Sequence, residues 1–99
     1  MDKIYKALAE VNRRKIVFWL GLGELKVNEI VNKLDLSQAT VSNHLSILRK
    51  AKLVDFKVNG KERIYKLNNE TAKQYVKELN RLMSIAGDTN IADEIIIRR

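Results

Sequence analysis

A short polar segment, residues 37–46, carries the side chains best suited to specific recognition chemistry. It reads Ser-Gln-Ala-Thr-Val-Ser-Asn-His-Leu-Ser, and its two bulky apolar residues, Val41 and Leu45, stand four positions apart. That spacing predicts a helix with one apolar side and short, mostly uncharged polar side chains elsewhere. Ser, Thr and Asn are poor helix formers, whereas a helix that faces only water usually carries Glu and Lys. These polar side chains match the donors and acceptors on base edges in the DNA major groove.

The segment that follows is strongly basic. Residues 49–66 contain seven basic and two acidic side chains, and their net charge of +5 accounts for most of the chain's net charge of +7. Charge alone leaves a polyanion partner and a solvated lysine-rich surface equally open. Lys61 and Arg63 could reach a DNA backbone or minor groove, or could simply guard a strand edge. Lys50 and Lys52 could contact phosphate or only favour a helix C-terminus.

Helical periodicity predicts four helices before this basic segment and one after it. The apolar positions of the five helices are 4/8/11, 16/17/20, 27/30/31/34, 41/45/48 and 72/75/76/79/82/83/86. Gly21 and Gly23 are expected to end the second helix, and Ser37 is a good N-cap for the fourth. Asn68 or Asn69 can cap the last helix.

The period changes from helical to alternating after Lys52. Val54, Phe56 and Val58 alternate with charged residues, which predicts a strand. Asn59-Gly60 predicts a type I′ hairpin turn. A turn centred there would place Lys57 opposite Glu62 on the returning strand.

The predicted fold is mainly α with a two-stranded β-wing (α+β), in the order α-α-α-α-β-β-α. This is a winged helix-turn-helix. We expect one DNA-binding and dimerisation domain over residues 1–87, followed by a tail, residues 88–99, with no clear period. The wide apolar stripe of the last helix predicts a homodimer interface shared with the first helix, the alternative being that it covers its own core. The expected interface residues are Ile4, Leu8, Tyr75, Leu79 and Leu82.

Composition argues against several other classes of protein. The 99-residue chain has no cysteine and a single histidine, so we expect neither a metal site nor a cofactor. One histidine without an oxyanion signature is no catalytic constellation, and we expect no enzyme. No apolar run approaches the roughly 18 residues needed to cross a bilayer, and the start lacks a signal-peptide pattern. We therefore expect a cytoplasmic protein that does not act on membranes.

Several motifs resemble the ArsR/SmtB family of winged-helix repressors. They are Ala7-Leu8-Ala9, Arg13-Arg14-Lys15-Ile16, Ser37–Leu45 with Leu48, Leu53-Val54, and Gly60 with Tyr65. The resemblance covers about residues 3–86. Such proteins are dimeric repressors, and many release DNA on binding a metal ion. The resemblance implies that the helix from Ser37 to Ala51 enters the major groove and that the first and last helices build the dimer.

The chain also departs from the pattern of this family. The stretch Glu24–Glu29 lacks the cysteines of some metal sensors, and Asn69–Met83 lacks the His and Asp ligands of others. Lys52 stands where glycine is usual, and Lys26 where a capping Ser or Thr is common. These departures predict a member that does not respond to metal.

We therefore expect a sequence-specific double-stranded DNA-binding regulator, a dimeric repressor that binds an inverted repeat. The expected DNA contacts are Gln38, Ala39, Thr40, Ser42, Asn43, His44, Ser46, Lys50, Lys61 and Arg63. For His44, placed near a phosphate or base by the resemblance, the alternative is a structural hydrogen bond. The alternative function is a winged-helix protein-interaction module, which would expose aromatic or aliphatic anchors on the same surface. A protein or small-molecule effector stays open.

Overall fold

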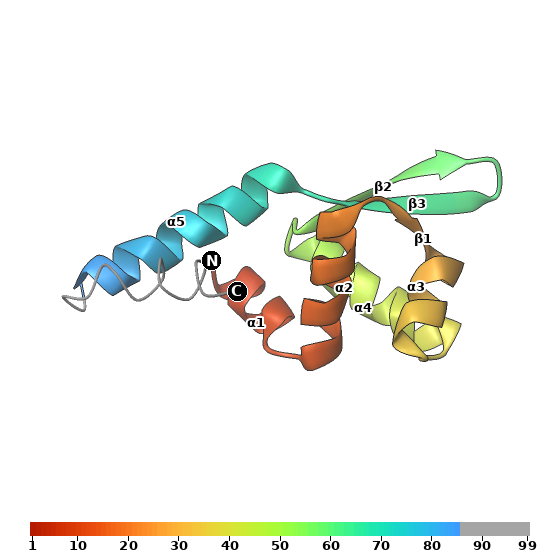
Figure 1. Cartoon of the computed structure of the whole chain (residues 1–99), viewed down its shortest axis with the longest axis horizontal. Coiled ribbons are helices and arrows are strands. Elements are labelled where there is room, and N and C mark those ends of the chain that lie inside the picture. Colours follow the sequence, from red (N-terminus) through yellow and green to blue (C-terminus); the bar gives the residue numbers. More distant parts are fainter. Residues whose placement is uncertain (86–99) are drawn as a thin grey trace.

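The computed structural model describes residues 1–85, which form five helices and a three-stranded antiparallel sheet. The elements are α1 (Asp2–Leu8), α2 (Val11–Leu22), β1 (Leu25–Lys26), α3 (Val27–Leu34), α4 (Gln38–Lys50), β2 (Val54–Asn59), β3 (Glu62–Leu67) and α5 (Asn69–Ile85). Helices α1 to α4 pack together, the β2–β3 hairpin projects to one side, and α5 leads away to the other (Figure 1). The predicted winged helix-turn-helix is confirmed. The predicted tail, residues 88–99, lies outside the described residues.

The core lies where α1 to α4 meet the base of the hairpin. The apolar stripes predicted for α2, α3 and α4 supply most of it, because Ile16, Ile30, Val41, Leu45 and Leu48 are all fully buried. Leu53 and Val54 extend this core into the start of β2. The core therefore fixes α4 along its inner side and leaves its outer side free.

Polar side chains cap the starts of α4 and α5. The hydroxyl of Ser37 accepts a hydrogen bond from the backbone N–H of Thr40 at 3.1 Å, so the predicted cap of α4 is confirmed. Asn68, rather than Asn69, caps α5, because its Oδ1 accepts from the N–H of Thr71 at 3.2 Å. Asp35 adopts a left-handed φ of 53° and ends α3, which gives the sharp turn between α3 and α4.

The hairpin differs in register from the prediction. Asn59 pairs with Glu62 and Lys57 with Ile64, so the type I′ turn at Asn59-Gly60 and the Lys57–Glu62 pair are both wrong. The turn is centred on Gly60 and Lys61, and Gly60 has the positive φ, 66°, that a type II′ turn needs at its first central position. The observed register puts Phe56 opposite Tyr65. Alternation could not reveal this, since the two registers differ by two residues and keep every side chain on the same face.

A third strand and an early helix break were also missed. β1 pairs with β3, and its two residues are too few to show an alternating pattern in the sequence. Val11 belongs to α2 rather than to the first helix, because Glu10 caps α2 by accepting from the N–H of Arg13.

Over residues 1–85, no helix is both long and apolar enough to span a bilayer.

Candidate nucleic-acid interface

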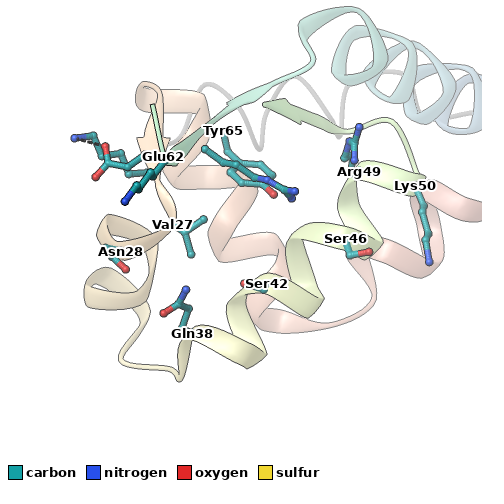
Figure 2. A pocket seen from close by; sticks show the side chains of 12 residues that line it. Val27, Asn28, Gln38, Ser42, Ser46, Arg49, Lys50, Glu62 and Tyr65 are labelled. Atoms are coloured by element: carbon teal, nitrogen blue, oxygen red, sulfur yellow. Dashed lines mark ion pairs between the residues drawn. The ribbon is translucent and has the colours of Figure 1, made fainter. Parts of the chain in front are cut away.

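An open groove of about 680 Å³ lies between α4 and the hairpin. Figure 2 shows polar side chains of α4 on one wall and residues of the hairpin on the other. The lining residues are Lys26, Val27, Asn28, Gln38, Ser42, Ser46, Arg49, Lys50, Lys61, Glu62, Arg63 and Tyr65. A groove bordered by an exposed polar helix and a projecting hairpin is the shape that a winged helix presents to a duplex.

One stripe of α4 supplies the polar wall of this groove. Gln38, Ser42, Ser46 and Arg49 recur at intervals of four, four and three residues, so they lie along one side of the helix. Each is exposed. On the opposite side, Val41 and the other buried apolar residues lock the rotation of α4, so the stripe is held facing the groove.

Positive charge dominates the groove lining. Arg49, Lys50, Lys61 and Arg63 meet there, and the one acidic lining residue, Glu62, is already paired with Lys26 at 2.9 Å. The hydrogen bond to the Glu62 carboxylate and its negative charge raise the pKa of Lys26. The remaining cations make this a surface for an anionic partner.

An aromatic ring organises two of these cations. The guanidinium of Arg49 lies 4.5 Å from the centre of the Phe56 ring, and that of Arg63 lies 4.4 Å from it. Phe56 is held by its contact with Tyr65, with ring centres 5.3 Å apart. One half-buried side chain therefore links the end of α4 to the hairpin and orients a guanidinium from each.

Most of the predicted contact residues share this surface. Gln38, Ser42, Ser46, Lys50, Lys61 and Arg63 line the groove, whereas Ala39, Thr40 and Asn43 are exposed on α4 without lining it. Sequence reasoning missed Lys26, Asn28 and Arg49. Arg49 could have been found, because it stands seven residues after Ser42 and so falls on the same stripe.

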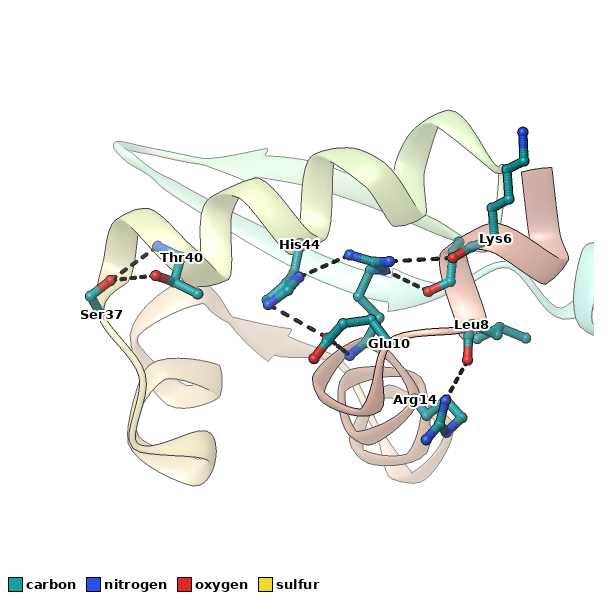
Figure 3. A network of polar contacts seen from close by, with 9 residues as sticks. Lys6, Leu8, Glu10, Arg14, Ser37, Thr40 and His44 are labelled. Atoms are coloured by element: carbon teal, nitrogen blue, oxygen red, sulfur yellow. Dashed lines mark hydrogen bonds and ion pairs between the residues drawn. The ribbon is translucent and has the colours of Figure 1, made fainter.

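His44 is not on this surface. It is 9% exposed and lies on the inner side of α4, where its Nδ1 is 3.3 Å from the guanidinium of Arg13 and its Nε2 is 3.7 Å from the carboxylate of Glu10 (Figure 3). The guanidinium of Arg13 can only donate in this contact, and Nε2 of His44 faces the carboxylate of Glu10. The structure therefore favours the alternative of a structural hydrogen bond over the predicted DNA contact of His44.

Arg13 joins this buried contact to the end of α1. Its Nε donates to the carbonyl of Ala7 at 2.5 Å and its Nη2 to the carbonyl of Lys6 at 3.3 Å. Desolvation would raise the pKa of Glu10. The N–H groups of Asn12 and Arg13 and the nearby charges outweigh desolvation, and the pKa of Glu10 therefore lies below its usual range. These contacts tie α1, α2 and α4 into one unit.

The predicted dimer residues divide into two groups. Ile4 is 7% exposed and lies in the chain's own core, so it has little surface left for a partner. Leu8 and Tyr75 pack against the same core, and the Tyr75 ring also contacts that of Tyr5. Leu79 is half-buried, and Leu82 is 43% exposed. Leu8, Tyr75 and Leu79 are all half-buried, so Leu82 keeps the largest exposed fraction of the five.

The described residues bring together few side chains that could bind a transition metal. Among residues 1–85, no three His, Cys, Asp or Glu side chains gather closely enough to hold a metal ion. The one histidine already faces Arg13 and Glu10. Zinc and copper sites need three or four converging ligands.

Known proteins with a similar sequence are bacterial regulators. The profile of the family described as "Bacterial regulatory protein, arsR family" matches residues 10–55. The chain is 38% identical over 77 residues to the "Cadmium resistance transcriptional regulatory protein CadC homolog" of Staphylococcus aureus, covering 77% of this chain and 64% of that protein, slightly under two thirds of its length. It is 31% identical to the "Transcriptional repressor SdpR" of Bacillus subtilis, covering 69% of this chain and 76% of that protein.

A solved structure supports the same relationship. HlyU from Vibrio cholerae matches with a TM-score of 0.69 and 34% sequence identity, and the match covers 81% of this chain and 87% of that one. These relatives are transcriptional regulators and not enzymes.

Proposed function

The chain belongs to the ArsR family of bacterial transcriptional regulators, and from that premise we propose that it is a repressor whose α4–hairpin groove reads double-stranded DNA. The observation that carries the proposal is the stripe from Gln38 to Arg49, which faces a cationic groove open to a partner. Short donors and acceptors on an exposed helix fit base edges in the major groove, where a good bidentate contact contributes about 1–3 kcal/mol of discrimination.

The two walls of the groove have separate roles in this proposal. Gln38 and Ser42, in the first turns of α4, read base edges. Lys61 and Arg63, at the hairpin, neutralise backbone phosphate or enter the minor groove, which gives affinity without sequence preference. The test is selection of bound sequences from random duplex DNA. Enrichment of one motif supports the proposal, and recovery of an unselected pool contradicts it.

The alternative function is an interaction module that binds protein. Such a surface would carry aromatic or aliphatic anchors. The only apolar lining residues of the groove are Val27 and Tyr65, and Tyr65 is 6% exposed. The lining therefore favours DNA over a protein partner.

We further propose that the protein is a symmetric homodimer built with α5. Leu79 and Leu82 present apolar surface on this helix, which leads away from the body of the chain (Figure 1). Two-fold symmetry would set the two α4 helices about one DNA turn, roughly 34 Å, apart and require an inverted repeat.

We expect Leu82→Asp to give monomers with weak operator binding, because it would place a charge in the apolar interface. Sedimentation measures the state of association. Asn80→Asp is the matched control, since it adds the same charge to an exposed position of α5 on another side. A wild-type chain that sediments as a monomer at micromolar concentration contradicts the proposal.

We also propose that divalent metal is not the effector. The sequence offers no cysteine and one histidine, which is buried and already engaged. We expect the same operator affinity with a chelator and with stoichiometric zinc, nickel, copper or cobalt. A reproducible tenfold loss, about 1.4 kcal/mol of coupling, with any of these metals would contradict this.

A further inference from the structure

A second open cavity, of about 600 Å³, lies at the C-terminal end of α4. It is bounded by the start of α1, the end of α4 and the first turns of α5. Three lysines line it, Lys3, Lys50 and Lys52, together with the hydroxyl-bearing Thr71 and the amide-bearing Gln74. Asp2 is the one acidic lining residue. The lining is thus cationic, with neutral hydrogen-bonding groups beside it.

Lys52 occupies this place at a conformational cost. Its φ is 63°, in the left-handed region where side chains are disfavoured. The N–H of Lys52 donates to the carbonyl of Arg49 at 2.9 Å, and that of Leu53 donates to the carbonyl of Leu48 at 3.0 Å. This is a Schellman motif with Lys52 at the position that glycine normally takes.

A favourable charge at the C-terminus of α4 does not by itself explain a lysine at position 52. A cation near the C-terminus of α4 is favourable, but Arg49 and Lys50 already supply two in the last turn. Glycine at position 52 would keep the motif and remove the strain. Residues held in such conformations concentrate at functional sites.

We propose that this cavity binds a small phosphate-bearing molecule, with Lys3, Lys50 and Lys52 as its cationic ligands. Within residues 1–85, none of these three ammonium groups lies within ion-pair distance of a carboxylate. Like charges sharing one cavity repel each other, and a multivalent anion between them would turn that repulsion into attraction. Thr71 and Gln74 supply further donors to its oxygens.

Lys50 couples this cavity to the groove, because it lines both. An anion bound at the C-terminal end of α4 would hold the Lys50 ammonium there and withdraw it from a DNA phosphate. The ligand is therefore expected to weaken DNA binding, and DNA to weaken ligand binding by the same factor. This part rests on the proposed function, whereas binding of the anion itself does not.

The direct test is a calorimetric titration of the full chain with inorganic pyrophosphate, without DNA and at constant ionic strength. We expect saturable binding of one anion per chain. Lys52→Gly and Lys52→Asn both suit the left-handed position, so both should keep or raise the thermal midpoint while weakening binding by roughly tenfold or more. Lys66→Ala, which removes an exposed lysine outside the cavity, should bind as the wild type does. Undiminished binding by both position-52 variants, or no saturable binding by the wild type, overturns the proposal.

A second arm separates a free anion from a DNA phosphate. Pyrophosphate should lower the affinity of the wild type for its selected duplex several-fold and leave that of Lys52→Gly unchanged. Without pyrophosphate, the salt dependence of DNA binding by Lys52→Gly should equal that of the wild type. A slope reduced by about one unit would show that the cavity holds a backbone phosphate, and would overturn the assignment to a small molecule. If the protein does not bind DNA at all, the proposed function fails, and the pyrophosphate titration without DNA still tests the anion site.

Discussion

The two sides of α4 carry polar side chains for different purposes. On the outer side, Gln38 and Ser42 face an open groove. Among residues 1–85, neither side chain takes part in any of the hydrogen bonds that the structure shows for side chains. On the inner side, His44 is held between Arg13 and Glu10. The inner polar group stabilises the fold, whereas the outer ones are available to a partner. The type of a side chain does not tell these roles apart; its position around the helix does.

The largest expected effect comes from removing the polar contacts on the inner side of α4. Arg13→Ala removes three charge-assisted hydrogen bonds that link α2 to the end of α1 and to His44. We expect it to lower the free energy of unfolding by about 1.5–3 kcal/mol, measured by urea denaturation, with little change in operator affinity of the folded fraction. Arg14→Ala is the control, because Arg14 makes one exposed hydrogen bond, to the carbonyl of Leu8. Equal losses from the two variants would remove the distinction between the two sides.

Changes on the outer side should have the opposite profile. Gln38→Ala or Ser42→Ala should lower affinity for the selected duplex by about 1–3 kcal/mol and leave binding to unrelated DNA nearly unchanged. Stability should change by no more than about 0.5 kcal/mol, since both side chains are exposed. Fluorescence anisotropy with matched and scrambled duplexes measures the first effect. Asn32→Ala, an exposed polar change on α3, should alter neither quantity.

A smaller effect should come from Phe56, which bridges α4 and the hairpin. Phe56→Leu keeps an apolar side chain but removes the ring beneath Arg49 and Arg63. We expect DNA affinity to fall by about 0.5–1 kcal/mol for each lost contact, with the salt dependence unchanged because both charges remain. Arg63→Ala should instead reduce the salt slope by about one unit. A reduced slope for Phe56→Leu would mean that the ring does not act by orienting the guanidinium groups.

The sequence predicts much of this arrangement because local patterns determine it. Apolar periodicity and the Ser37 cap place α4 correctly, and the unusual run of small polar residues marks its outer side. The position of His44 was also within reach, since residues 41, 44, 45 and 48 complete a single buried stripe at i, i+3, i+4 and i+7. The family resemblance suggested a DNA contact there instead.

Other features depend on contacts between distant residues and could not be predicted. The hairpin register follows from the packing of Phe56 on Tyr65 and from the pairing of β3 with the two-residue β1. The burial of Ile4 follows from how α1 packs on the body of the chain, whereas its sequence shows only an apolar stripe. Neither contact leaves a local pattern.

The central claim is that the outer side of α4 and the hairpin together form the surface that contacts DNA. Its most direct test is chemical-shift mapping of isotope-labelled protein titrated with the selected duplex. We expect the largest shifts at Gln38, Ser42 and Arg49 on α4 and at Lys61 and Arg63 on the hairpin, with small changes on the exposed part of α2 around Phe18. Large shifts on that part of α2, with the groove unaffected, would contradict the account.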